Sequence, residues 1–109
     1  MIIDCHTHVP PAARWELFLR ECRDNGIALS VVSSLGSWAR YPDAVDVRRA
    51  NVEAAQLAAF AKGMVLWFAY LNPQLADWPA ELERCVATGA RGVKLWVSLK
   101  DPDSGSLER

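Results

Sequence analysis

Four apolar runs along the chain alternate with segments that carry apolar residues at helical spacing. The runs cover residues 1–9, 27–32, 64–71 and 91–99. Each run is short and rich in β-branched or aromatic residues, which indicates a buried strand. The run at 64–71 is apolar on both faces, as expected for a parallel strand that is covered on each side.

Three amphipathic segments separate these runs, with apolar residues every three or four positions within 11–24, 43–61 and 77–88. Asp43 and Asp77 stand where side chains that cap helix N-termini are expected, and a glycine follows the end of each segment. The order is therefore β-α-β-α-β-α-β. This order is typical of an α/β fold with a parallel sheet and right-handed crossovers.

The composition excludes several classes of protein. The 109 residues are 51% hydrophobic and carry a net charge of −1, which suits one domain and offers no basic surface to nucleic acid. No apolar stretch approaches a membrane span and no signal-peptide pattern opens the chain, so we expect a cytoplasmic protein without membrane contacts. Cys5, Cys22 and Cys85 lack metal-type spacing and are expected to be reduced, with Cys5 packed against a covering helix.

Both histidines of the chain, His6 and His8, lie at the end of the first run. On a strand, residues i and i+2 point to the same face, and their side chains emerge roughly 6–7 Å apart. Two imidazoles so placed can bind one metal ion. Pro10 and Pro11 follow, so the pair stands at the carboxyl end of a strand, where α/β folds place their chemistry. The bland alternative is an exposed pair of histidines without a ligand.

Three further residues are candidates for the same site. Asp4 shares the face of the histidines, one step deeper, where it would orient a ligand imidazole or be a buried polar group satisfied in the floor of the fold. Trp38 and Arg40 fall in the polar loop 33–42, which is long for a connection of this kind. They would either line a pocket or belong to an ordinary surface loop.

An ordered set of motifs resembles the amidohydrolase superfamily, and within it the amidohydrolase-related family of metal-dependent hydrolases and non-oxidative decarboxylases. The motifs are Ile2–His8, Arg49–Asn51, Phe68–Pro73 and Gly89–Trp96. The resemblance covers essentially the whole chain. It implies the N-terminal half, strands one to four of eight, of a TIM (β/α)₈ barrel, a fold that needs about 250 residues. We therefore expect residues 1–109 to form a single partial barrel domain that is truncated at its C-terminus.

The resemblance also implies a divalent metal, expected to be Zn²⁺, bound by His6 and His8. The family's further ligands are histidines after the fourth strand and an aspartate on the eighth strand that is also the general base. The chain has two histidines in all, so these positions have no counterpart and no catalytic base is assigned. Lys94 lies on the fourth strand, where some branches carry a carbamylated lysine that bridges two metals. The alternative for Lys94 is a charge that lines the pocket or contacts substrate.

Three functional hypotheses follow. The first is a metal-dependent hydrolase whose activated water attacks a C–N, C–O or lactone bond of a small carboxylate, amide or lactone substrate, active as part of a longer chain. The second is a non-oxidative decarboxylase of the same family. The third is a non-catalytic half-barrel fragment or interaction module, whose open sheet edges would pair with a second copy in a homo-oligomer.

Overall fold

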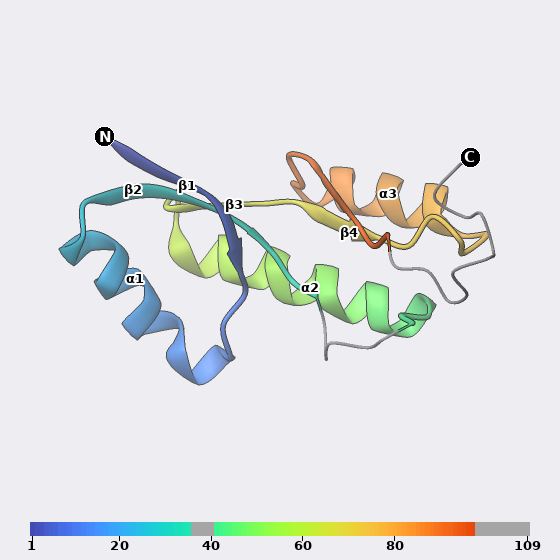
Figure 1. Ribbon diagram of the computed structural model, residues 1–109, viewed down its shortest axis with the longest axis horizontal. Helices are drawn as coiled ribbons and strands as arrows, with labels where there is room; N and C mark the ends of the chain where they lie inside the picture. The colour runs from blue at the N-terminus through green and yellow to red at the C-terminus, as the bar shows by residue number, and fades with distance from the viewer. Residues whose placement is uncertain (36–40, 98–109) are drawn as a thin grey trace.

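The structure, a computed structural model, describes residues 1–35 and 41–97. Strands and helices alternate along the described chain as the hydrophobic pattern predicts (Figure 1). The elements are β1 (Ile2–His8), α1 (Trp15–Asp24), β2 (Ile27–Ser33), α2 (Ala44–Ala61), β3 (Val65–Trp67), β4 (Ala69–Leu71), α3 (Trp78–Ala87) and β5 (Val93–Leu95), with a 3₁₀ turn at Ala12–Arg14 before α1. Every strand pair in the described residues is parallel. The fold is therefore mixed α/β with parallel strands, which is consistent with part of a TIM-barrel-like fold.

The strand expected at 64–71 is two strands, because the chain changes its pairing partner at Phe68. β1, β2 and β3 form one sheet, and β4 and β5 form another. The N–H of Phe68 still donates to the carbonyl of Val32 at 2.9 Å, on the side of β2. The next residue, Ala69, donates to the carbonyl of Gly92 at 2.8 Å, on the side of β5. The sequence pattern predicted the extended segment correctly and its division incorrectly.

A side chain of α2 satisfies the backbone hydrogen bonds on the edge of β4 that does not pair with β2. Neighbouring residues of a strand direct their backbone groups to opposite edges, so Tyr70 faces away from β5, toward the edge that β2 leaves after Ser33. The N–H of Tyr70 donates to Oδ1 of Asn51 at 2.6 Å, and Nδ2 of Asn51 donates to the carbonyl of Tyr70 at 2.9 Å. The carboxamide of Asn51 thus takes the place of a neighbouring strand at this one residue.

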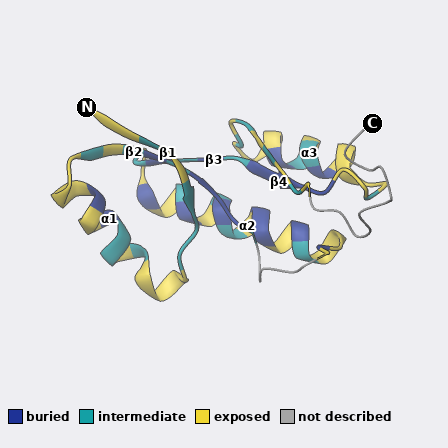
Figure 2. Ribbon diagram, viewed as in Figure 1, coloured by how far each residue is buried: buried dark blue, intermediate teal, exposed yellow. Residues whose placement is uncertain are grey.

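The core forms where α2 packs on the strands. The buried face of the helix is the predicted apolar stripe, Val47, Ala50, Ala54, Leu57 and Ala61. Figure 2 shows this buried face along α2 beside the buried strands, while Figure 1 shows α1 and α2 on one side of the strands and α3 beside β4. The small alanine side chains allow the helix to lie close to the sheet.

Only one of the two expected helix caps forms. Oδ1 of Asp43 accepts from the N–H of Asp46 at 2.9 Å, and Oδ2 of Asp46 accepts from the N–H of Asp43 at 3.0 Å, which is a capping box. Asp77 occupies the N-cap position of α3, but its side chain makes no cap hydrogen bond. Its ψ of 6° departs from the extended conformation in which an N-cap side chain usually meets the helix amides.

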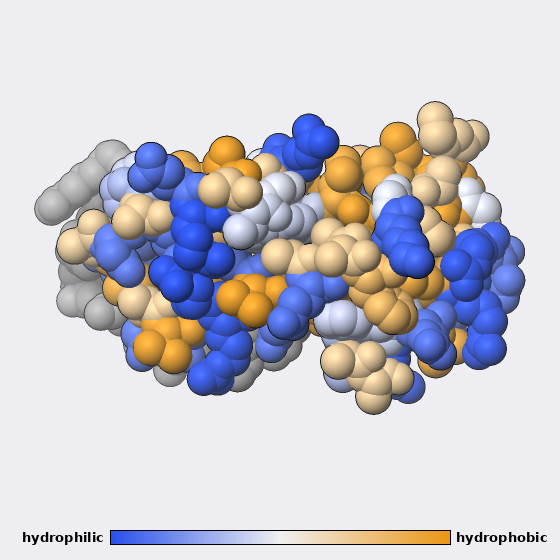
Figure 3. Space-filling model, turned by 180° about the vertical axis from the view of Figure 1, so that it is seen from behind, coloured by the Kyte–Doolittle hydropathy of each residue, from blue (hydrophilic) through white to orange (hydrophobic). Residues whose placement is uncertain are grey.

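β1 and β5 lie at the outer edges of the two sheets and expose apolar side chains. Ile2 is 53% exposed, and Val93 and Leu95 are 43% and 49% exposed. Figure 3 shows apolar residues gathered toward the end of the molecule that holds β1 and β2. Cys5 is exposed, which corrects the expectation that a helix covers it, because β1 packs extensively only on β2 in the described residues. No helix among the described residues is both long and apolar enough to cross a bilayer.

Candidate functional site

The two histidines lie together at the carboxyl end of β1. Their ring centroids are 5.2 Å apart and their planes are perpendicular, at 90°. The pairing of β1 with β2 shifts between Asp4 and Thr7, so the strand is irregular in the segment that contains His6. Two rings bound to one tetrahedral ion, with Zn–N bonds of about 2.0–2.1 Å, would have centroids roughly 5 Å apart. The spacing of the pair therefore fits a shared ion.

The backbone around the pair fixes its position. The N–H of His6 donates to Oδ1 of Asp4 at 3.1 Å, and Nδ1 of His8 lies 3.3 Å from the carbonyl oxygen of Ser33. The β1–β2 pairing sets His8 opposite Ser33 and so produces the second contact. A proton on Nδ1 would be donated to that carbonyl, and Nε2 would then carry the lone pair that a metal requires.

Asp4 contacts the main chain of His6, whereas the carbonyl of Ser33 contacts the ring of His8. The role expected of Asp4, to orient a ligand imidazole, stays a prediction.

A small cleft brings His6 and Lys94 together from opposite ends of the described chain. Its volume is about 150 Å³. It is lined by Cys5, His6, Thr7, Val31, Val32, Ser33, Phe68, Val93 and Lys94. Lys94 is the middle residue of β5, opposite Tyr70 of β4, and its role in a site stays a prediction.

The loop residues expected at the pocket are Trp38 and Arg40, and both lie outside the described residues. The first described residue after them, Tyr41, is exposed and sets its ring edge to face against Trp96, with centroids 5.9 Å apart. Trp96 follows β5, and its N–H donates to the carbonyl of Leu71 at 2.8 Å. This aromatic pair joins the end of the loop to the carboxyl ends of β4 and β5.

The described residues lack the full ligand set of a catalytic metal site. They contain no group of three or more His, Cys, Asp or Glu side chains that could hold an ion. Catalytic zinc sites usually have three protein ligands. His6 and His8 fit two of these positions, so a complete site needs ligands from outside the described part of this chain.

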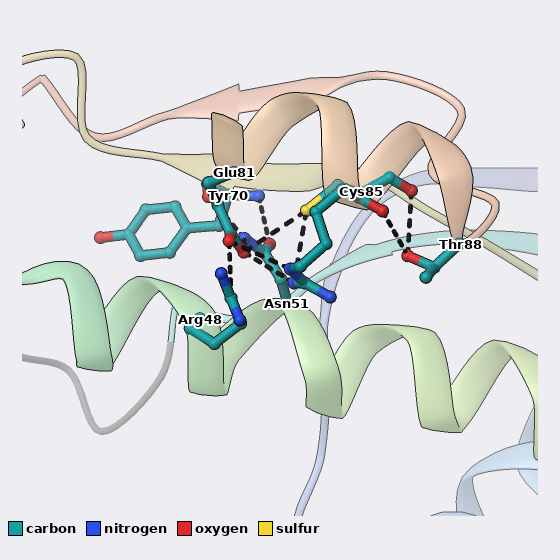
Figure 4. Close-up of polar contacts among 7 residues, drawn as sticks. Arg48, Asn51, Tyr70, Glu81, Cys85 and Thr88 are labelled. Atoms are coloured by element: carbon teal, nitrogen blue, oxygen red, sulfur yellow. Dashed lines mark hydrogen bonds and ion pairs between the residues drawn. The ribbon is translucent and has the colours of Figure 1, made fainter. Parts of the chain in front are cut away.

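A second polar cluster lies between α2 and α3, and sequence reasoning did not find it (Figure 4). Glu81 is only 5% exposed. Its carboxylate accepts from Nε of Arg48 at 2.6 Å, from Nη2 of Arg84 at 2.7 Å and from Nδ2 of Asn51 at 3.0 Å. Burial alone would raise the pKa of this carboxyl group. Its hydrogen bonds from these donors, and the charge of Arg84, nevertheless lower the pKa of Glu81 to about 2.

The position of Glu81 along α3 is the signal that could have revealed this cluster. Glu81 lies four residues before Cys85 and therefore on the same face of the helix, and Cys85 is fully buried. Burial, followed by the charge of Glu81, raises the pKa of the Cys85 thiol to about 11. A glutamate on a buried helix face needs positively charged partners, and two arginines provide them here.

Comparison with known proteins identifies the fold. No family model matches the chain, and no curated protein matches it. A crystal structure described as amidohydrolase II is similar to this chain, with a TM-score of 0.70 and 24% sequence identity. The match covers 87% of this chain and 40% of that one, so the chain spans well under half of the solved protein. The resemblance inferred from the motifs is confirmed at the level of architecture: the chain has an amidohydrolase-like fold.

Proposed function

We propose that this chain is part of a metal-dependent hydrolase of the amidohydrolase-related family, in which His6 and His8 bind a divalent ion, expected to be Zn²⁺. The observation that carries the proposal is the imidazole pair, with centroids 5.2 Å apart at the carboxyl end of a parallel strand. The amidohydrolase-like fold of the chain supports it. Parallel α/β folds place their reactive groups at this end of the strands.

The residues of the chain would prepare this site in distinct ways. A proton on Nδ1 of His8 would be donated to the carbonyl of Ser33, 3.3 Å away, and would set the orientation and tautomer of that ring. Val32 and Phe68 give the cleft that contains His6 an apolar wall. A bound zinc ion would supply a water of lowered pKa and polarise the bond to be cleaved.

We also propose that this chain forms strands one to four of a longer (β/α)₈ barrel. The general base and the further metal ligands would then come from the remaining four strands of that barrel. The coverage of 40% of the solved amidohydrolase II structure supports this view. The exposed apolar residues of β1 and β5 also support it, because such edges pair readily with further strands. The intact mass of the protein from its native source should exceed about twice the 12.1 kDa of this chain. A native mass near 12.1 kDa would contradict the longer barrel.

Calorimetric titration of the metal-free chain with Zn²⁺ tests the metal site. We expect one ion per chain, and affinity at least about tenfold weaker in His6→Ala and in His8→Ala. Cys5→Ala is the matched control, because it removes an exposed thiol from the same strand. Its affinity should equal that of the unaltered chain. Unchanged zinc binding in the double variant His6→Ala/His8→Ala would refute the proposed site.

The reaction class is tested on the native protein with amide, ester, lactone and aromatic acid substrates. Metal-dependent hydrolysis is the expected result. Release of carbon dioxide from aromatic acids, without a hydrolysis product, would contradict the hydrolase and favour the decarboxylase. Zinc binding without either reaction would make the chain a non-catalytic module.

A further inference from the structure

Lys94 is a half-buried cation for which the described chain provides no counter-ion. It lies in the middle of β5 and lines the cleft that also contains His6. Among the described residues it makes no hydrogen bond and no ion pair, whereas Arg48 and Arg84 both meet Glu81. A charge that is partly removed from water is costly unless a partner of opposite sign compensates it. The partner of Lys94 is therefore to be sought outside the described residues.

The chemistry of the cleft indicates the sign of that partner. None of its described lining residues is a carboxylate, and Lys94 carries the one formal positive charge among them if the imidazole is neutral. Thr7 and Ser33, which carry hydroxyl groups, also line the cleft. The remaining wall is largely apolar, and a charge beside an apolar wall acts more strongly than one in bulk water. The cleft is thus complementary to an anion.

The size and the wall of the cleft restrict the anion further. The cleft measures about 150 Å³, and its walls include Val31, Val32, Phe68 and Val93. Such a cleft suits a compact organic body that buries apolar surface while one charged group meets the lysine. We infer that this cleft binds a small organic carboxylate whose charged group pairs with Lys94. As a statement about substrate, the inference rests on the proposed function, because it places the carboxylate beside His6.

Benzoate and benzamide are the probes that test the inference, because they share a ring and differ in charge. The metal-free chain, kept in a chelator, is titrated with each compound and followed by backbone amide NMR. Benzoate should shift the amide signals of cleft residues and bind at least about tenfold more tightly than benzamide, with an affinity that falls as salt is added. Equal binding of the two compounds, or no benzoate binding by about 10 mM, would overturn the inference. If sulfate binds as tightly as benzoate, the inference that the ligand is an organic carboxylate is overturned.

Substitutions at Lys94 separate its charge from its shape. Lys94→Met keeps the length of the side chain and should weaken benzoate binding at least about tenfold, while Lys94→Arg keeps the charge and should bind within about threefold of the unaltered chain. Lys62→Met is the control, since it removes an exposed lysine at the end of α2, and its benzoate affinity should not change. Unaltered benzoate binding in a folded Lys94→Met chain would refute the role of Lys94. If that variant unfolds, weak benzoate binding by Lys94→Arg refutes it instead.

The inference and the proposed metal site fail in different experiments. His8→Ala, at a position outside the lining of the cleft, should lose zinc affinity at least about tenfold and keep benzoate binding in chelator. Lys94→Met should lose benzoate binding and keep zinc binding. Loss of both ligands in each variant would show a collapsed cleft and would overturn the assignment of the carboxylate to Lys94.

Discussion

The cluster around Glu81 and the site around His6 are two polar regions of the molecule, and within the described residues only the first is complete. Glu81 accepts hydrogen bonds from four side chains, those of Arg48, Asn51, Arg84 and Cys85, and α2, α3 and β4 are joined through this cluster. In the proposed metal site the histidine pair would supply two ligands of an ion, and Lys94 beside His6 meets no carboxylate in the described residues. The polar groups around Glu81 find their partners within the described residues, whereas the set around His6 lacks further ligands and a counter-ion there.

On the proposed function, this difference separates the polar groups that stabilise the fold from those that would bind a ligand. Buried polar groups in folded proteins are almost always hydrogen-bonded, because an unpaired group costs free energy. The Glu81 cluster follows this rule, and no described buried side-chain nitrogen or oxygen is left without a partner. A set of half-exposed metal-ligand and cationic side chains that remains incomplete is instead expected where something else binds. The two regions should therefore respond differently to mutation.

The largest effect is expected from Glu81→Ala. It leaves Arg48 and Arg84 without their carboxylate, and removal of one partner from a buried ion pair is strongly destabilising. Because the two arginine side chains are 55% and 29% exposed, we expect a loss near the low end of the range, about 3 kcal/mol in the free energy of unfolding. Urea titration measures it. Glu83→Ala on the exposed side of the same helix should stay within about 0.5 kcal/mol, and equal losses in both variants would contradict the special role of Glu81.

Asn51→Ala should have the next largest effect. It leaves the N–H and the carbonyl of Tyr70 without partners and removes one donor from Glu81. We expect a loss of about 2 kcal/mol in unfolding free energy and faster hydrogen exchange at the amide of Tyr70. Gln56→Ala removes an exposed carboxamide from the same helix and serves as the control. Unchanged exchange at Tyr70 would mean that Asn51 does not substitute for a strand.

A smaller effect should appear as a dependence of stability on pH. The pKa of Glu81 is about 2 in the folded chain, below the value of about 4.3 of an unperturbed glutamate. Its contribution is therefore fully present above about pH 5 and is lost as the pH falls toward 2. Between pH 5 and pH 3, the unaltered chain should lose roughly 1 to 2 kcal/mol more unfolding free energy than Glu81→Gln. Parallel stability curves for the two chains would rule out this charge as the cause.

The smallest effect on stability is expected at the open site. His6 is exposed, and Asp4 accepts from its backbone N–H rather than from its ring. His6→Ala should therefore change the unfolding free energy of the metal-free chain by less than about 0.5 kcal/mol. Added zinc should stabilise the unaltered chain by mass action and leave the variant unchanged. A large loss of stability without metal would place His6 among the structural residues.

The sequence predicted those parts of the fold that depend on short-range signals. The stripe from Val47 to Ala61 follows from helical spacing, and Asp43 caps α2 because an acceptor three residues before Asp46 meets its amide. Gly26 ends the first helical segment with a φ of +72°, a conformation that favours glycine. The proximity of His6 and His8 likewise follows from the period of a strand.

Features that depend on which elements become neighbours could not be predicted in this way. The division at Phe68 requires that β2 end at Ser33 and that Asn51 reach Tyr70 from α2. The period of α3 places Glu81 on the face of Cys85, but it does not show that Arg48 and Asn51 meet Glu81, because that depends on α2 lying against α3. The meeting of Lys94 with His6 in one cleft depends on the order of the strands. Within the site, the residue types were therefore predictable and their partners were not.

NMR of the imidazole nitrogens during a zinc titration observes the pairing of His6 and His8 on one ion. The NMR signal of one nitrogen of His6 and that of Nε2 of His8 should shift in parallel as zinc is added. Both shifts should be complete at one equivalent of Zn²⁺. The Cys5→Ala chain should give the same titration. Shifts in only one ring, or separate shifts that need two equivalents of zinc, would show that the histidines do not share an ion and that the proposed metal site is wrong.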